Sequence, residues 1–295
     1  MKTNSQSHSH DPAQSLQILM PWCMTERERQ SLQKTIELAN THQVWTWQPF
    51  SKNQRVMQHL LNAGVSDDPQ DLHSHSLIVI PPHGAPHALR KRWKAEGRKM
   101  VDFSTPEVRR AQTSLSLLKL EGAELIIIGS KDDPEVIAQI TDHHRAIVVE
   151  TAEEAVRIPF APNYGVICET TFHHSLAKHL LEVMRNRRRD SRFTFLDTTD
   201  ECEGKRYRQV ADLTHDADLL LILGCSQSAK MLAHSAAEAR IRAKILTNVS
   251  ELRDTDLSER KIVVTAASDV LPEEANEMVD KIKQLLQRKN GPQAA

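Results

Sequence analysis

The feature that most constrains the fold is a short unit that occurs three times along the chain, over residues 76–86, 123–136 and 217–228. Each copy has a polar or acidic residue before the strand, at least four aliphatic residues in a row, and then a loop that contains Gly, Ser, His or Cys. An aliphatic run that ends in such a loop is typical of a strand buried on both faces of a parallel sheet. The repeat therefore predicts an α/β fold.

The second copy shows the pattern best. Its aliphatic run, Leu125 to Ile128, stops at Gly129, and Pro134 then opens a helix at its first turn, where the missing N–H costs nothing. Ligands of parallel sheets sit at the carboxyl ends of the strands, which here is the loop 130–135. Three such units imply three related lobes whose loops converge on one site, but the repeat does not name a function.

Composition excludes several classes of partner. Aromatic residues make up only 4% of the chain, so the cores must be aliphatic. The 38 basic and 39 acidic residues nearly cancel and give no electrostatic argument for nucleic acid or a membrane surface. Mean hydropathy is −0.48, and no apolar run approaches the ~18–20 residues of a membrane span. Residues 1–15 lack the apolar core of a secretory signal and are expected to form a disordered tail. We expect a cytoplasmic protein.

The four cysteines are widely spread and form no CxxC motif: Cys23, Cys168, Cys202 and Cys225. In a cytosolic chain this pattern favours free thiols or metal ligands over disulfides. Cys23 precedes a predicted helix over 25–40, for which Thr25 and Glu28 form a capping box. A helix N-terminus lowers a thiol pKa and favours the thiolate that metals need. The alternative is a small buried residue that packs the turn.

Other loops carry further candidates. His83 stands between Pro82 and Gly84 after the predicted strand 77–80, where it is either a ligand contact or a surface histidine. Thr105 lies in a segment that caps the predicted helix 107–121. Cys202 lies in a polar segment read as a loop, and the predicted strand 16–20 precedes Cys23.

In order and spacing, these loops resemble the LytB/IspH family, the 4-hydroxy-3-methylbut-2-enyl diphosphate reductases, from about residue 16 to 286. The resemblance is carried by Asp133-Pro134-Glu135-Val136 after Gly129, His83-Gly84 after a strand, Glu169-Thr170-Thr171 before a helix, Cys202 six residues before Arg208-Gln209, and Thr265-Ala266 followed by Pro272-Glu273. None of these marks is specific alone, so the family is identified by their shared order.

The resemblance implies a three-lobed α/β trefoil with mostly parallel sheets around a central cavity. The lobes would span residues 16–101, 102–195 and 196–286, with a frayed tail over 287–295. In this family each lobe gives one Cys to a 4Fe-4S cluster, because thiolates hold such clusters. The open iron binds the hydroxyl oxygen of the substrate during a reductive dehydroxylation, in which it acts as a Lewis acid. Polar loop residues grip the diphosphate.

The family's site maps onto this chain with several replacements. Cys23 and Cys202 match the first and third cluster cysteines, but the second falls at Thr105, whose hydroxyl is a poor iron ligand. Glu135 matches the acidic proton donor, and Thr170 the threonine beside the open iron. The substrate-binding positions are occupied by Lys52, His83, Ser228 and Lys230, and Asp133 replaces another substrate histidine. We expect His83, Glu135, Thr170, Cys202 and Ser228 to surround one cavity, and no stable cluster to form.

Three functions follow from this map. A working reductase would need a third soft ligand, for which Cys168 and Cys225 are the candidates. A non-catalytic member would keep the fold and bind either a protein partner or an anionic small molecule, such as a small phosphorylated ligand held by cations such as Lys52 and Lys230. We rank this second reading first. An unrelated α/β nucleotide or sugar-phosphate enzyme ranks last, because the chain has no GxGxxG or GxxxxGK[ST] loop. The sequence names no protein partner.

Overall fold

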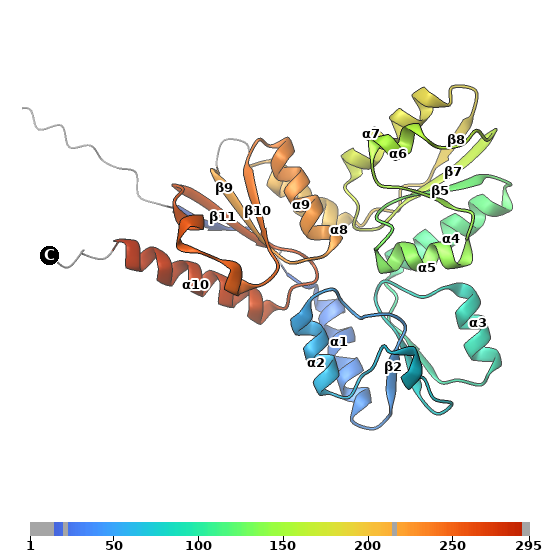
Figure 1. The fold of residues 1–295 in the computed structure, drawn as a ribbon, viewed down its shortest axis with the longest axis horizontal. Coiled ribbons are helices and arrows are strands. Elements are labelled where there is room, and N and C mark those ends of the chain that lie inside the picture. The colour runs from blue at the N-terminus through green and yellow to red at the C-terminus, as the bar shows by residue number, and fades with distance from the viewer. Residues whose placement is uncertain (1–14, 20–22, 214–216, 291–295) are drawn as a thin grey trace, which may run out of the picture.

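The computed structural model describes residues 15–19, 23–213 and 217–290, and these form three lobes, each built on its own parallel sheet (Figure 1). The strand orders are β1-β11-β9-β10, β2-β3-β4 and β6-β5-β7-β8, and every strand pair in the described chain is parallel. The strands are β1 Ser15–Ile18, β2 Val44–Thr46, β3 Leu77–Ile80, β4 Met100–Asp102, β5 Glu124–Ile128, β6 Ile147–Val149, β7 Asn163–Cys168, β8 Arg192–Phe195, β9 Leu219–Leu223, β10 Arg242–Leu246 and β11 Lys261–Ala266. The expected three-lobed α/β fold is confirmed.

Each repeated sequence unit supplies an interior strand of its own sheet. These strands are β3, β5 and β9, and each has neighbours on both sides. All residues of β3 and β9 are buried, and so are the last four of β5. A strand covered on both faces must be apolar at every position, which explains why the runs do not alternate with polar residues.

Helices cover both faces of the sheets. They are α1 Glu26–Ala39, α2 Gln54–Asn62, α3 His87–Ala95, α4 Pro106–Leu120, α5 Pro134–Asp142, α6 Ala152–Val156, α7 His174–Arg187, α8 Glu201–Ala211, α9 Gln227–Glu238 and α10 Pro272–Asn290. The capping box predicted from Thr25 and Glu28 is present, and α5 begins at Pro134 as expected. Local capping residues and an N-terminal proline therefore predict where these two helices begin.

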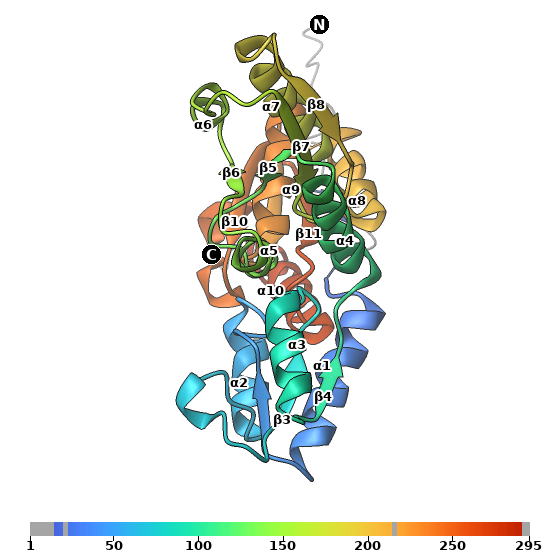
Figure 2. The same ribbon diagram turned by 90° about the vertical axis from the view of Figure 1, so that its right-hand side faces the viewer.

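In lobe 1, alternate residues of β3 point to opposite faces of the sheet. Val79 packs with Val56 and Leu60 of α2 on one face. Ile78 and Ile80 pack with Trp93 of α3 on the other. The lobe is thus a three-layer sandwich, and Figure 2 shows it at one end of the molecule.

Lobes 2 and 3 share a hydrophobic core. It joins Ile126 and Ile128 of β5 to Leu220 and Ile222 of β9 through Tyr207 of α8. The opposite face of the lobe 2 sheet packs against α4 and α5, and that of the lobe 3 sheet against α10. Because apolar contact crosses the boundary, the two lobes support each other.

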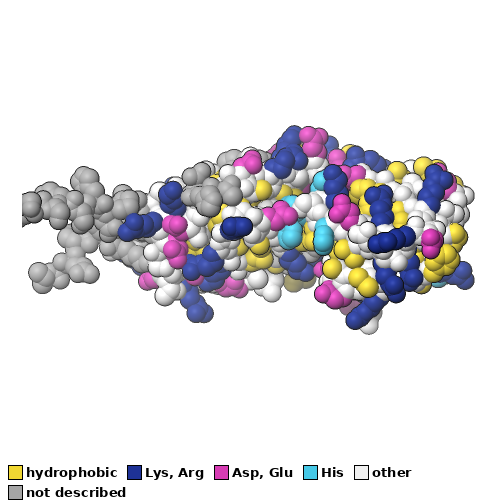
Figure 3. Space-filling view, turned by 90° about the horizontal axis from the view of Figure 1, so that it is seen from above, with side chains coloured by type: hydrophobic (Ala, Val, Ile, Leu, Met, Phe, Trp, Pro, Cys, Tyr) yellow, Lys and Arg dark blue, Asp and Glu magenta, His cyan; other side chains and the backbone are white. Residues whose placement is uncertain are grey.

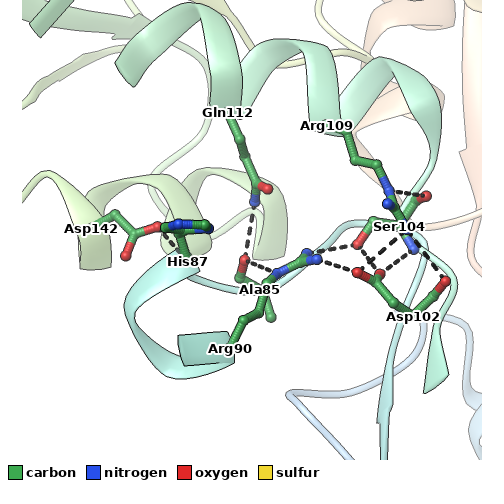
Figure 4. Close-up of polar contacts among 8 residues, drawn as sticks. All are labelled: Ala85, His87, Arg90, Asp102, Ser104, Arg109, Gln112 and Asp142. Atoms are coloured by element: carbon green, nitrogen blue, oxygen red, sulfur yellow. Dashed lines mark hydrogen bonds and ion pairs between the residues drawn. The ribbon is translucent and has the colours of Figure 1, made fainter. Parts of the chain in front are cut away.

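Lobe 1 is joined to lobe 2 by polar contacts at the start of α3 (Figure 4). The N-cap residue Pro86 makes no side-chain cap. Asp142, at the end of α5 in lobe 2, instead accepts hydrogen bonds from the backbone N–H groups of His87 and Ala88. Gln112 of α4 also donates to the Ala85 carbonyl, at 3.2 Å. A carboxylate at a helix N-terminus stabilises it through the helix dipole, so lobe 2 caps a helix of lobe 1.

Two boundaries need correction. The first strand, expected in lobe 1, pairs instead with β11, with Leu16 opposite Ile262. It therefore belongs to the lobe 3 sheet, where it covers an otherwise open edge. Helix α10 continues to Asn290, beyond the expected start of a frayed tail at 287. Of the tail predicted over residues 1–15, Ser15 instead begins β1, whereas residues 1–14 and the last five residues of the chain lie outside the described residues. No described helix is both long and apolar enough to cross a membrane.

Candidate functional site

A cavity of about 490 Å³ lies where the three lobes meet. Its lining includes Lys52 and His83 from lobe 1, Glu135 and Thr170 from lobe 2, and Cys202 from lobe 3. These residues are far apart in the sequence, and they meet because the loops after strands of different sheets face the same centre. The structure thus brings together four of the five side chains that we expected around one cavity. Ser228 is not in the lining.

Five helices begin at this cavity. Their N-cap residues all line it: Thr25 of α1, Thr105 of α4, Asp133 of α5, Asp200 of α8 and Ser226 of α9. A helix N-terminus carries a partial positive charge that favours anionic groups. This arrangement accounts for the acidic side chains in the first turns of α1, α4, α5 and α8. Helix α9 differs, because the Ser226 side chain makes no cap.

Glu135 is buried and held by hydrogen bonds. Its Oε2 accepts from the Thr170 hydroxyl at 2.6 Å and from the Thr170 backbone N–H at 3.2 Å. Its Oε1 accepts from Gln139 Nε2 at 3.0 Å. Burial raises the pKa of Glu135 to about 8, since the hydrogen bonds from Thr170 only partly offset the cost of desolvating the charged form. The carboxyl group therefore carries a proton near neutral pH.

Two more buried carboxyl groups lie beside Glu135. Asp133 caps α5, and burial raises its pKa against the opposing positive charges of Lys52 and Lys230. Glu169 accepts from the Ser130 N–H at 2.9 Å, and burial raises its pKa well above the usual value. Burial thus raises the pKa of three carboxyl groups of lobe 2.

Gly129 explains how Glu169 fits so closely beneath the loop. A Cβ atom at Gly129 would lie 2.8 Å from the Cβ of Glu169 and 3.0 Å from a Val136 methyl group. Contacts that short require the neighbours to move. The glycine that ends the aliphatic run is therefore needed for packing at the site.

His83 provides an uncharged nitrogen at the cavity. Burial, followed by the nearby charge of Lys52, lowers its pKa to about 3, although a hydrogen bond with the Trp47 backbone opposes this shift. Its Nε2 atom is buried and has no hydrogen-bond partner within the described chain. Such an atom can contact a ligand, as the sequence suggested, so His83 is not a surface histidine.

Two cysteines occupy the positions expected for metal ligands, but they differ in access. Cys202 is exposed and lines the cavity. It lies in the first turn of α8 rather than in a loop, because Asp200 caps that helix by accepting from the Cys202 N–H. Cys23 is buried and absent from the lining. Burial raises the pKa of the Cys23 thiol, so the expected lowering by the helix N-terminus is wrong.

A buried ion pair between Arg206 and Glu203, which the sequence did not predict, lies at the cavity, where Glu203 is part of the lining. Arg206 donates to the carbonyl oxygens of Cys23 and Ala266, at 2.6 and 3.1 Å. Its Nε lies 3.7 Å from Glu203 Oε1, and both side chains are at most 5% exposed. Residues three apart face one another on a helix, so this spacing could have revealed the pair had α8 been recognised.

The last two expected substrate contacts lie off the cavity surface. Ser228 is fully buried and donates to Glu203 Oε2 at 2.6 Å. Lys230 is exposed and outside the lining, but its positive charge opposes the rise in the pKa of Asp133. Substrate-binding roles for these residues, and catalytic roles for Glu135 and Thr170, stay predictions.

Comparison with known proteins identifies the family. A family model described as "LytB protein" matches residues 22–283. This chain belongs to the LytB family. A 4-hydroxy-3-methylbut-2-enyl diphosphate reductase of Solidesulfovibrio magneticus is 24% identical over 249 residues, covering 82% of this chain and 86% of that protein. The reductase of Alkaliphilus oremlandii is 27% identical over 196 residues, covering 65% and 68%.

Solved structures show the same fold. A reductase from Plasmodium falciparum superposes with a TM-score of 0.82 at 18% identity, over 92% of this chain and 88% of that one. A second reductase structure gives 0.61 at 19% identity, over 93% and 99%. This LytB-family chain therefore keeps the family's three-lobed architecture at low sequence identity.

The cysteines of this LytB-family chain do not fit an iron–sulfur cluster of the family type. Among the described residues, Cys202 is the only thiol in the cavity lining. Cys168 lies in the shared core of lobes 2 and 3, where burial raises its pKa well above the usual value. Cys225 Sγ lies 3.2 Å from Asp269 Oδ2, and burial raises its pKa to about 12. Neither cysteine supplies a second thiolate at the cavity.

Thr105, where we expected the family's second cluster cysteine to fall, serves α4 as its N-cap, since its hydroxyl accepts from the Val108 N–H at 3.2 Å. We expect Thr105→Ala to lower the free energy of unfolding by about 1 kcal/mol. Thr113→Ala, on the exposed side of the same helix, should be neutral or slightly stabilising because Ala is the better helix former. Urea unfolding measures the change in the free energy of unfolding for both variants. Equal changes in Thr105→Ala and Thr113→Ala would contradict the capping role of Thr105.

Proposed function

We propose that this LytB-family protein does not carry out reductive dehydroxylation and that its central cavity binds a small phosphorylated ligand in the cytoplasm. The observation that carries the proposal is the single thiol, Cys202, among the described residues of the lining. A cluster with one open iron needs three protein thiolates. An active reductase with a rewired ligand set has less support, because Cys168 is in the core and Cys225 is bound to Asp269.

Several features support an anionic ligand. Lys52 lines the cavity, and it takes part in none of the ion pairs found within the described chain. The N-terminus of α9, which has no side-chain cap, offers backbone N–H groups of the kind that bind phosphate. A protonated Glu135 does not repel an anion, and His83 Nε2 can accept a hydrogen bond from a hydroxyl group.

Calorimetric titration with inorganic diphosphate and with isopentenyl diphosphate tests the binding. We expect saturable binding that Lys52→Ala weakens by about tenfold or more, since a hydrogen bond to a charged group contributes roughly 1.5–3 kcal/mol. Lys94→Ala is the matched control, because Lys94 is exposed on α3 and outside the lining.

Two results would count against the proposal. If Lys52→Ala and wild type bind the two diphosphates with equal affinity, the ligand does not bind in the cavity. Turnover of 4-hydroxy-3-methylbut-2-enyl diphosphate by the anaerobically purified protein, with a supplied reductant, would contradict the loss of catalysis.

A further inference from the structure

A second cluster of ligating side chains lies away from the cavity, where lobes 2 and 3 meet. His173 precedes α7 of lobe 2, and His234 and Glu238 lie on α9 of lobe 3. Their ligand atoms all lie within 4.8 Å of one another. Figure 3 shows histidine side chains beside acidic ones near the middle of this face of the molecule. None of the three residues lines the central cavity.

The spacing suits a single small cation. His234 Nε2 lies 3.4 Å from Glu238 Oε1, and His173 Nε2 lies 4.0 Å from Glu238 Oε2. Zn²⁺ bonds of roughly 2.0–2.2 Å in a tetrahedron place neighbouring ligand atoms about 3.3–3.5 Å apart. The two measured distances end on different oxygens of Glu238, so a single ligand oxygen requires the three ligand atoms to close from at most 4.8 Å to that spacing. Small side-chain rotations supply such a shift.

Hydrogen bonds fix the tautomer of His173. Ser175 Oγ lies 2.8 Å from Glu238 Oε1 and 2.8 Å from His173 Nδ1. An ionised carboxylate only accepts, so the single hydroxyl proton of Ser175 goes to Glu238. The Ser175 oxygen must then accept from an Nδ1–H of His173. With the hydrogen on Nδ1, Nε2 is the ring nitrogen of His173 that can bind a metal ion.

This tautomer leaves two acceptors facing each other. His173 Nε2 and Glu238 Oε2 lie 4.0 Å apart, and in this tautomer both atoms are acceptors. A cation between them removes the conflict. Metal-bound histidines commonly donate their other ring N–H to an oxygen, which is the part that Ser175 plays here.

We propose that His173, His234 and Glu238 bind one Zn²⁺ or a similar divalent transition-metal ion, with water completing a four-coordinate site. Two imidazoles and one carboxylate are a ligand set that zinc takes. His174 does not belong to the site, because its Nδ1 lies 2.9 Å from Asp197 Oδ2.

The bound ion would tie lobe 3 to the loop that carries part of the cavity wall. The His173 ring stacks on Tyr207, with centroids 5.1 Å apart. The Tyr207 hydroxyl donates to the Thr171 carbonyl at 2.6 Å, and Thr171 lines the cavity. The ion therefore joins α9 to the start of α7 and steadies that loop from outside.

Zinc titration of untagged, metal-free protein tests the site. The parent should carry His8→Gln and His10→Gln, because the N-terminal segment offers two other imidazoles. We expect one Zn²⁺ per chain, a rise in melting temperature with Zn²⁺, and a Co²⁺ absorption spectrum typical of four-coordination. His234→Gln and Glu238→Gln should each weaken binding at least tenfold, and so should Ser175→Ala through the tautomer.

Controls separate this site from the others. His59→Gln, on the exposed side of α2, and Cys202→Ser, at the cavity, should bind Zn²⁺ as the parent does. His234 and Glu238 are partly exposed, so their variants should fold, and circular dichroism of the metal-free proteins checks this. Equal Zn²⁺ affinity in the parent, His234→Gln and Glu238→Gln would overturn the proposal. So would the absence of binding at micromolar Zn²⁺.

Discussion

Replacement of Arg206 with Ala should lower the free energy of unfolding by about 3–5 kcal/mol. The guanidinium is 3% exposed, and its loss leaves the Glu203 carboxylate buried without its cation. It also removes the donors to the Cys23 and Ala266 carbonyls, which join the segment before α1 to the end of β11. We expect a lower urea midpoint with an unchanged slope.

The neighbouring residue gives a matched control. Lys205 pairs with Glu201 at 3.3 Å on the same helix, but both side chains are more than half exposed. Lys205→Ala should therefore change stability by no more than about 0.5 kcal/mol. In the double variant Arg206→Met, Glu203→Gln, no charge is left unpaired, so part of the lost stability should return. Equal losses in Arg206→Ala and Lys205→Ala would contradict the assigned role of the buried pair.

The stability of the wild-type protein should fall as pH rises from about 4.5 to about 8, and Glu135→Gln should remove the part of that fall that comes from Glu135. The folded pKa of Glu135 is about 8, against an ordinary value of 4.5. Between these values the folded state holds a proton that the unfolded state has released, so stability is full below 4.5 and is lost as pH rises through 8. At 1.36 kcal/mol per unit, the loss is of the order of 5 kcal/mol.

Urea unfolding at pH 5 and pH 8.5 measures this difference. Glu135→Gln keeps an uncharged side chain of the same shape, so its stability relative to wild type should be greater at pH 8.5 than at pH 5. Some dependence of stability on pH remains in the variant, because burial also raises the pKa of Glu28 to about 7, that of Glu169 well above the usual value and that of Asp133. Glu182→Gln, on the exposed side of α7, should show the same dependence of unfolding free energy on pH as wild type. If Glu135→Gln also shows the wild-type dependence, the prediction is wrong and Glu135 is ionised in the folded protein.

Features that depend on local pattern could be predicted from the sequence. The aliphatic runs of β3, β5 and β9 need cover on both faces, which places them inside sheets. The pairing of β1 with β11 depends on residues about 245 positions apart, and nothing in the first strand itself specifies that partner. The start of α8 was missed because charged residues and Gly204 hid its apolar spacing, although Asp200 is a capping residue.

The candidate site could be predicted to the level of loops but not of side chains. His83, Glu135 and Thr170 reach the cavity because they follow interior strands of parallel sheets. Ser228 turns to Glu203 instead, since the orientation of α9 depends on its packing in the shared core. The raised pKa of Cys23 was also missed, because burial outweighs the effect of a nearby helix terminus.

The central claim, that this cavity holds no iron–sulfur cluster, is tested most directly by sulfide. After anaerobic reconstitution with iron and sulfide, we predict no acid-labile sulfide bound per chain and no cluster signal in the electron paramagnetic spectrum. Iron alone is not diagnostic, because the site of His173, His234 and Glu238 also suits that metal. About four irons and four sulfides per chain, lost in Cys168→Ser or Cys225→Ser, would contradict the claim and indicate an active reductase.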